Sequence, residues 1–387
     1  MFQKGRNHLK IIHGLVFHEG KGFVRDTLYT EQDCFSRSTS EDTILDADGC
    51  YVIPGLIDIH FHGCAGHDFS DASPEGLATI AKYQLSQGVT SICPASMTLA
   101  PQTLRNICEC GKDFSSKDEP NGSRLVGINL EGPFISGHKC GAQNPAFVHP
   151  ADLTLLEELQ SYAGGLVKLV TLAPETEGAM DFIRQVKHSD LKDISISLGH
   201  TESDYDTAKK ALDLGANHIT HLFNAMPGFT HRAPGVIGAA FDAPDCFVEI
   251  ICDGVHIAPP VIRAAFAMFG SHRIVLISDS MRATGLSDGS YTLGGLDVQV
   301  NGKHATLADG TLAGSVTNLL HCMRCAVSMG IPLEDAVQCA TINPARSIGI
   351  DSHYGSLAPG KAADFLLLDK SLNLVGIYKN GHKIETE

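Results

Sequence analysis

The sequence predicts an α/β protein, with a (β/α)8 TIM-like barrel and a small β-sandwich domain built from both chain termini. Continuous apolar runs alternate with helical patterns, as in parallel strands that are covered by helices. Eight such runs favour a closed barrel. An open doubly wound sheet is the alternative, but no glycine-rich phosphate fingerprint follows the first run. The eight runs span residues 56–59, 89–93, 125–130, 167–172, 194–198, 218–222, 248–252 and 274–277.

The two ends of the chain resemble each other in pattern. Short alternating runs separated by glycines occupy residues 1–50, and two further runs near the C-terminus include the turn dipeptide Asn380-Gly381. We therefore expect the ends to pair into one domain. The predicted division is 1–54 and 355–387 for the small β domain and 55–354 for the catalytic barrel.

Two polar segments interrupt the barrel pattern. Residues 112–121 end in Pro-Asn-Gly and are predicted to form a surface loop. The glycine-rich segment 285–295, after the eighth run, is predicted to be a mobile loop or a hairpin.

Composition limits the function classes. The chain has 387 residues, 43% of them apolar and 19% charged, which is typical of a globular enzyme or binding protein. A net charge of −15 argues against a general nucleic-acid or anionic-membrane binder, although one local basic pocket is compatible with it. Neither a signal peptide nor a membrane-spanning run is visible, so we expect a cytoplasmic protein.

The cysteines fit a reducing compartment. Several of the 12 lie inside apolar runs, as small buried residues do. Cys322-x-x-Cys325 matches half of a redox or zinc motif, but no second such pair accompanies it and the segment is predicted to be helical.

The first barrel run ends in a histidine pair. The apolar run 51–63 is predicted to contain a buried strand between Pro54 and Gly63, and strand alternation would turn Asp58, His60 and His62 to one side. Two imidazoles at the end of a buried strand suit a divalent metal. An isolated pair is equally compatible with ordinary core or surface histidines.

Other ionisable residues follow the later runs. Glu131, His200 and His221 come at the ends of the third, fifth and sixth runs, and Asp279 follows the eighth. The carboxyl ends of barrel strands meet at one mouth, where the active sites of such barrels lie. One Glu, several His and one Asp at that mouth have the composition of a catalytic metal site.

Simpler interpretations stay open for some of these residues. Glu131 before Gly-Pro is compatible with a helix cap, and His200 with a loop histidine. Asp253 before a glycine is compatible with a turn. His218 is three residues from His221 and is predicted to be a packed, hydrogen-bonded residue that faces the other way.

These motifs together resemble the amidohydrolase superfamily and, within it, the N-acetylglucosamine-6-phosphate deacetylases. The match extends over most of the chain, and LEGPF and HLFNAM are its most specific parts. The matching segments are PGLIDIHFHG (54–63), LEGPF (130–134), GAQNP (141–145), LGHT (198–201), HLFNAM (221–226), DGVH (253–256), SDS (278–280), LAGS (312–315) and GSLAPGKAAD (355–364).

The resemblance implies a metal-dependent enzyme. Glu131, His200 and His221 would hold the main ion, and His60 and His62 resemble the ligands of a second one. Many amidohydrolases use a modified lysine on strand four, but here Lys168 lies inside its run. The ion would be Zn, Fe, Co or Mn, with one or two per subunit.

The resemblance also implies the residues that bind the substrate. Asn224 and Ala225 would lie near a phosphate, His256 would contact the amide carbonyl, and Arg232 would reach the phosphate from a partner subunit of a homodimer. Gln143 belongs to a lid-like loop. The full expected set is Ala142, Gln143, Asn224, Ala225, Arg232, His256, Leu312, Ala313 and Gly314.

The implied reaction is hydrolysis of N-acetyl-D-glucosamine 6-phosphate to D-glucosamine 6-phosphate and acetate, in amino-sugar catabolism. Asp279 would act as general base towards a metal-activated water and then as general acid towards the leaving nitrogen. One alternative is another amidohydrolase reaction, on a cyclic amide or a related N-acyl sugar. Another is a scaffold that has lost activity, against which the intact Glu, His and Asp set argues.

Overall fold

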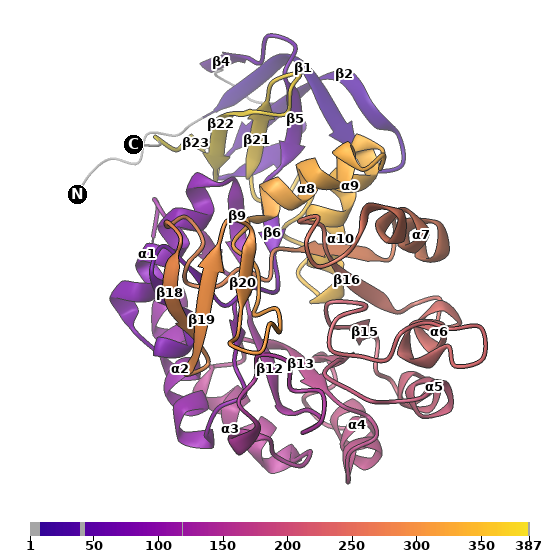
Figure 1. The fold of residues 1–387 in the computed structure, drawn as a ribbon. Coiled ribbons are helices and arrows are strands. Elements are labelled where there is room, and N and C mark those ends of the chain that lie inside the picture. The colour runs from indigo at the N-terminus through magenta and orange to yellow at the C-terminus, as the bar shows by residue number, and fades with distance from the viewer. Residues whose placement is uncertain (1–7, 39–42, 118, 386–387) are drawn as a thin grey trace.

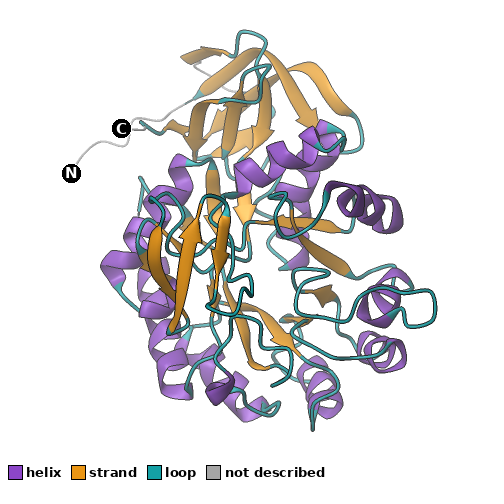
Figure 2. Cartoon of the chain, viewed as in Figure 1, coloured by secondary structure: helices purple, strands orange, loops and turns teal. Residues whose placement is uncertain are grey.

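The computed structural model describes residues 8–38, 43–117 and 119–385. The chain has a mixed α/β fold, in which a curled parallel sheet is surrounded by helices and a second sheet lies against one end (Figure 1). In Figure 2 the helices form an outer ring around the strands of the curled sheet. Within the described residues, no helix is both long enough and apolar enough to cross a bilayer.

All eight apolar runs contain a strand, as predicted. Seven strands form one parallel sheet in the order β10-β12-β13-β14-β15-β16-β17, and β11-β9-β6 form a three-stranded parallel sheet beside it. Backbone bonds join the two at both ends, from Ala95 N–H to the Phe61 carbonyl and from Asp279 N–H to the His60 carbonyl. The strands are β6 (Leu56–Asp58), β9 (Val89–Ile92), β10 (Ala95–Ser96), β11 (Arg124–Leu125), β12 (Ile128–Phe134), β13 (Val167–Leu172), β14 (Ser195–Leu198), β15 (His218–Ile219), β16 (Phe247–Ile251) and β17 (Ile274–Ile277).

The helices cover the outer face of this curled sheet because alternate strand residues point outwards. In β16, Val248 and Ile250 pack in the large cluster between strands and helices, whereas Ile251 packs in an inner cluster. The main helices are α1 (Pro74–Ser86), α2 (Pro101–Ser115), α3 (Leu153–Tyr162), α4 (Ala179–Lys187), α5 (Tyr205–Asp213), α6 (Gly235–Phe241), α7 (Pro259–Phe269), α8 (Leu319–Ser328), α9 (Leu333–Ala340) and α10 (Ile342–Ser347). Short elements are β7 (Gly63–Cys64), β8 (His67–Asp68), η1 (Phe69–Asp71) and η2 (Pro145–Phe147).

Strands from both ends of the chain form the second sheet, whose order is β23-β22-β21-β5-β1-β2-β3, with β4 paired to β1. In Figure 1 its indigo and yellow strands lie side by side. The strands are β1 (Leu9–His18), β2 (Gly22–Glu31), β3 (Cys34–Ser36), β4 (Thr43–Asp46), β5 (Tyr51–Pro54), β21 (Phe365–Leu368), β22 (Leu374–Lys379) and β23 (His382–Lys383). The predicted pairing of the two ends is therefore present as one continuous sheet.

The strand predicted between Pro54 and Gly63 is shorter than expected, because β6 ends at Asp58. The apolar run 51–63 that contains it also includes β5. The run is divided at Gly55, because β5 pairs antiparallel with β21 whereas β6 pairs parallel with β9. A Cβ atom at Gly55 would lie 2.1 Å from Thr90 Oγ1, so only glycine fits where the chain crosses from one sheet to the other.

The predicted loop at 112–121 is wrong in its first part, since α2 continues to Ser115. Leu104, Ile107, Cys108, Gly111 and Phe114 form its buried face, and this helical spacing extends into the polar segment. Residue 118 lies outside the described part of the chain.

The segment 285–295 includes a hairpin, which was one of its two predicted forms. β18 (Gly289–Leu293) pairs with β19 (Leu296–Asn301) across Gly294 and Gly295, and β20 (His304–Thr306) completes a three-stranded sheet. Both glycines have positive φ, as a two-residue hairpin turn requires. The 12 cysteines all lie in the described residues and are free thiols.

Candidate active site

Six ionisable side chains converge at the carboxyl end of the curled sheet. His60 and His62 follow β6, Glu131 lies in β12, His200 follows β14, His221 follows β15 and Asp279 follows β17. They form two groups, His60–His62–Asp279 and Glu131–His200–His221, and within each group the ligand atoms lie within 4.8 Å of one another. The structure thus brings together all the metal ligands that the sequence predicted.

Glu131 lies between the two groups. Its Oε1 atom is 3.1 Å from His200 Nε2 and 3.0 Å from His221 Nε2, and these two nitrogens are 3.0 Å apart. The Glu131 carboxylate also lies 3.3 Å from the Nε2 atoms of both His60 and His62.

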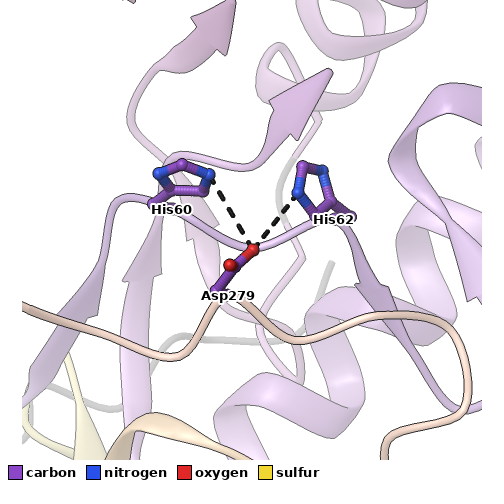
Figure 3. A group of neighbouring side chains, drawn as sticks. All are labelled: His60, His62 and Asp279. Carbon is purple, nitrogen blue, oxygen red and sulfur yellow. Dashed lines mark ion pairs between the residues drawn. The ribbon is translucent and has the colours of Figure 1, made fainter. Parts of the chain in front are cut away.

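Asp279 follows the neighbouring strand β17 and faces the histidine pair. Its Oδ1 atom is 3.3 Å from His62 Nε2 and 3.9 Å from His60 Nε2 (Figure 3). Asp58, which was expected to point with the two histidines, instead accepts a hydrogen bond from Ser278 Oγ at 2.5 Å. Strand alternation does not apply beyond Asp58, because β6 ends there.

The donor set fits a divalent cation. His200 Nδ1 lies 2.9 Å from the Lys139 carbonyl, and His62 Nδ1 lies 3.3 Å from the Ala95 carbonyl. A carbonyl oxygen can only accept a hydrogen bond, so Nδ1 of each of these two rings carries a proton. When the ring is neutral, its Nε2 atom has no proton and its lone pair points towards Glu131. Buried lone pairs and carboxylate oxygens that face one another at about 3 Å repel unless a cation lies between them.

Both carboxyl groups of the cluster are held in the ionised form. Burial alone would raise the pKa of Glu131, but the positive charge of the neighbouring His60 outweighs it and holds that pKa well below its usual range. Burial also opposes ionisation of Asp279, and the contacts with His62 and His60 lower its pKa in spite of this. Asp279 is therefore available as a proton acceptor at neutral pH.

Three of the clustered residues have left-handed backbones. φ is 47° at His200, 27° at His221 and 49° at Asp279, which is uncommon for residues other than glycine and is frequent at functional sites. Ser315 N–H bonds to the Asp279 carbonyl at 2.7 Å. A Cβ at Gly314 would lie 3.0 Å from that same carbonyl, so the 312–315 segment needs glycine to pack against Asp279.

The cluster opens into a cavity of about 340 Å³. Its walls include His62, Glu131, His200, His221 and Asp279. Seven of the expected substrate-binding residues line it as well: Ala142, Gln143, Asn224, Ala225, His256, Leu312 and Gly314.

Gln143 is buried and holds Glu131 directly. Its Nε2 donates to Glu131 Oε2 at 2.5 Å, and its Oε1 accepts from Thr98 N–H at 2.6 Å. The segment expected to be lid-like therefore anchors a ligand side chain in this structure.

Two expected substrate residues lie away from the cavity. Ala313 is fully buried in the apolar cluster that contains Met281, Leu293 and Val298, so its side chain is not part of the cavity wall. Arg232 is exposed and does not line the cavity of its own chain.

His256 lines the cavity and is paired with Asp253 behind it. Asp253 accepts from His256 Nδ1 at 2.7 Å and from the backbone N–H groups of Val255 and His256. Asp253 therefore forms a turn and also holds a side chain of the cavity wall. Burial opposes charge on His256, but Asp253 outweighs it and raises the pKa of the imidazole above its ordinary value.

Sequence reasoning missed three residues at this site. His138 and Lys139 line the cavity, and the signal that could have found them is a pair of basic residue types between two matched motifs. Glu249 lies inside the seventh apolar run, where a single acidic residue was the only signal.

His218 is fully buried, and its Nδ1 atom lies 3.1 Å from Ser197 Oγ, so it is packed and hydrogen-bonded as predicted.

Comparisons with known proteins identify similar chains. The model of the amidohydrolase family matches residues 51–384. An N-acetylglucosamine-6-phosphate deacetylase from Bacillus subtilis (strain 168) is 39% identical over 328 residues, which is 84% of this chain and 82% of that protein. An N-acetylgalactosamine-6-phosphate deacetylase from Escherichia coli O157:H7 is 33% identical, over 88% of this chain and 89% of that protein.

A solved structure is similar over nearly the whole chain. It is a mutant N-acetyl-D-glucosamine-6-phosphate deacetylase from Mycobacterium smegmatis in complex with N-acetyl-D-glucosamine-6-phosphate, with 32% sequence identity and a TM-score of 0.89. The match covers 99% of this chain and 100% of that one.

Proposed function

The chain belongs to the amidohydrolase family, and from that membership we propose that it hydrolyses N-acetyl-D-glucosamine 6-phosphate to D-glucosamine 6-phosphate and acetate. One observation carries the proposal. Two groups of side chains that are suited to bind a cation meet at one cavity, and one of these groups includes the ionised Asp279. An amide is a poor electrophile with a poor leaving group, so its hydrolysis needs an activated water and a proton donor.

Glu131, His200 and His221 would hold the main ion, and His60, His62 and Asp279 offer a second position. The imidazole and carboxylate donors suit Zn, Fe, Co or Mn. When bound, the ion would supply Lewis-acid activation of water and of the acetyl carbonyl.

Asp279 and His256 carry out the remaining chemistry. The Asp279 carboxylate accepts a proton from the attacking water and returns it to the departing nitrogen. His256, whose protonated form is favoured by its contact with Asp253, would donate a hydrogen bond to the acetyl oxygen as negative charge develops there. Both side chains line the same cavity, which supports this division of roles.

The phosphate end of the substrate would lie near Asn224 and Ala225. Lys139 supplies a cation from the same chain. By the resemblance, Arg232 would supply a second cation from a partner subunit, and its place in an exposed loop that does not line its own cavity agrees with this. The enzyme would therefore work as a homodimer with shared sites.

We extend the proposal to the architecture. The described residues of 55–354 would form the (β/α)8 catalytic barrel, and those of 1–54 and 355–387 would form the small β domain as a sandwich. The bonds between Asp279 and His60 and between Ala95 and Phe61 support closure of the barrel. Free thiols throughout the described chain agree with a reducing, cytoplasmic compartment.

The test of function is acetate release from a substrate panel. N-acetylglucosamine 6-phosphate should be turned over fastest, ahead of its N-acetylgalactosamine epimer, unphosphorylated N-acetylglucosamine and a cyclic amide. Preference for the epimer would move the assignment to a related N-acyl sugar. No turnover of any substrate by the metal-loaded protein would support the inactive scaffold instead.

Replacing Arg232 by Ala should raise KM for the phosphorylated sugar by about 10- to 100-fold, as expected for the loss of charge-assisted hydrogen bonds to a dianion. KM for the unphosphorylated sugar should change much less. Steady-state kinetics on both sugars measures the difference, and equal changes on both would contradict a phosphate contact.

Mixing subunits tests whether Arg232 acts across the dimer. Arg232→Ala and Asp279→Asn chains are combined under conditions that allow exchange, and activity is measured well below KM. If the arginine acts in trans, each hybrid has one intact site and activity returns. If exchange is confirmed and no activity returns, the shared-site arrangement is wrong.

A further inference from the structure

Glu249 connects the two ligand groups and has no role in the chemistry proposed above. It lies in the middle of β16 and is fully buried. Its Oε2 atom is 2.8 Å from His60 Nδ1 and accepts the backbone N–H of His221 at 3.0 Å. One carboxylate oxygen therefore touches a residue from each group.

The surroundings of Glu249 do not account for a carboxylate there. Its second oxygen has no hydrogen-bond partner among the described residues, and the Nδ1 atom of His218 lies 3.8 Å from it. A buried charge is costly, and exchanging a buried ion pair for apolar residues of similar volume is often neutral or stabilising. Stability of the fold alone would not favour Glu at this position.

The two contacts of Glu249 act on different properties of the ligand residues. The hydrogen bond that Glu249 accepts from His60 Nδ1 fixes the His60 ring, so that Nε2 points towards Glu131 and Asp279. The hydrogen bond that Glu249 accepts from the His221 backbone N–H stabilises a backbone with φ of 27°, and this turn directs the His221 ring at Glu131.

We infer that Glu249 is a positioning residue that holds His60 and His221 at once, so that a single carboxylate sets the geometry of both metal-ligand groups. The inference rests on the proposed metal site. Partners of metal ligands in general tune metal affinity by about 10- to 100-fold, and a partner common to both groups is expected to reach the upper part of that range.

The experiment compares Glu249→Gln with Asp364→Asn. Both changes remove the charge of a buried carboxylate and keep an acceptor oxygen. Asp364 is a matched control, because it also accepts one side-chain bond, from Arg124, and one backbone bond, from Asn380. The readouts are zinc and cobalt affinity by equilibrium dialysis, the visible spectrum of the cobalt-loaded protein, and Tm of the metal-free protein.

Glu249→Gln should weaken metal affinity about 10- to 100-fold and change the cobalt spectrum, whereas Asp364→Asn should change neither. In a His60→Ala background the loss caused by Glu249→Gln should be smaller, because one of its two contacts is already gone. Wild-type affinity and spectrum in Glu249→Gln would overturn the inference, as would an equal loss in both backgrounds.

The outcome also separates this inference from the proposed function. If the unaltered chain binds no divalent metal, the proposed metal site fails. If it binds metal and Glu249→Gln binds equally well, only the role of Glu249 fails. If the Gln variant does not fold, Glu249→Asp replaces it in the test. Asp keeps the charge but its shorter side chain withdraws the oxygen from His60 and His221, so metal affinity should fall by the same amount. If neither variant folds even with metal, Glu249 serves the fold and the inference is overturned.

Discussion

Replacing Asp279 by Asn should lower kcat by about 100-fold or more, within the range of about 10²–10⁴ that general acid–base catalysis contributes. The amide keeps the size of the side chain and an oxygen beside His62, but it cannot take a proton from water. The wild-type carboxylate is ready to do so, because its contacts with His62 and His60 keep its pKa low in spite of burial. Steady-state kinetics with N-acetylglucosamine 6-phosphate measures the loss.

The loss of kcat can be assigned to proton transfer only if the variant still binds metal and substrate. Metal retained by the Glu131 group and KM should both stay near wild type in Asp279→Asn. Asp213→Asn is the control, because that carboxylate is exposed on α5 and pairs with Lys209. A kcat within a few-fold of wild type in Asp279→Asn would rule out Asp279 as the proton shuttle.

Much of the fold was predictable because the strands of the curled sheet are buried on both faces and appear as apolar runs. β13 and β17 coincide with their predicted runs at both ends. β15 is shorter than its run, since the chain leaves the strand after Ile219 and reaches φ of 27° at His221. The break at Gly55 depends on Thr90 from another strand, and local periodicity contains no information about that contact.

The site was predictable to the extent that its residues come at the ends of apolar runs. Parallel strands of one curled sheet bring their carboxyl ends together, so His60, Glu131, His200 and Asp279 could be grouped from the sequence. Glu249 could not, because its importance lies in contacts with His60 and His221, which come from two other strands. The reach of Arg232 into a neighbouring subunit is a property of an assembly and stays a prediction.

Replacing His200 by Ala should remove most of the bound metal and most of the activity together. The Glu131 carboxylate would lose one of the nitrogens that converge on it, and His221 would lose the neighbour whose Nε2 lies 3.0 Å from its own. Elemental analysis of protein purified without added metal should show the loss.

His60→Ala should lower the content only of a second ion and leave the first largely in place.

A stability measurement makes the same prediction independently of activity. A ligand that binds only the folded chain stabilises it, so chelation should lower Tm of the unaltered protein. The His200→Ala protein has little bound metal to lose, and its Tm should respond little to chelator. His188→Ala, which changes an exposed histidine at the end of α4, should behave like wild type in both assays. Near-normal metal content in His200→Ala, or a full chelator response, would show that the ion is held without His200 and that the main ligand set is different.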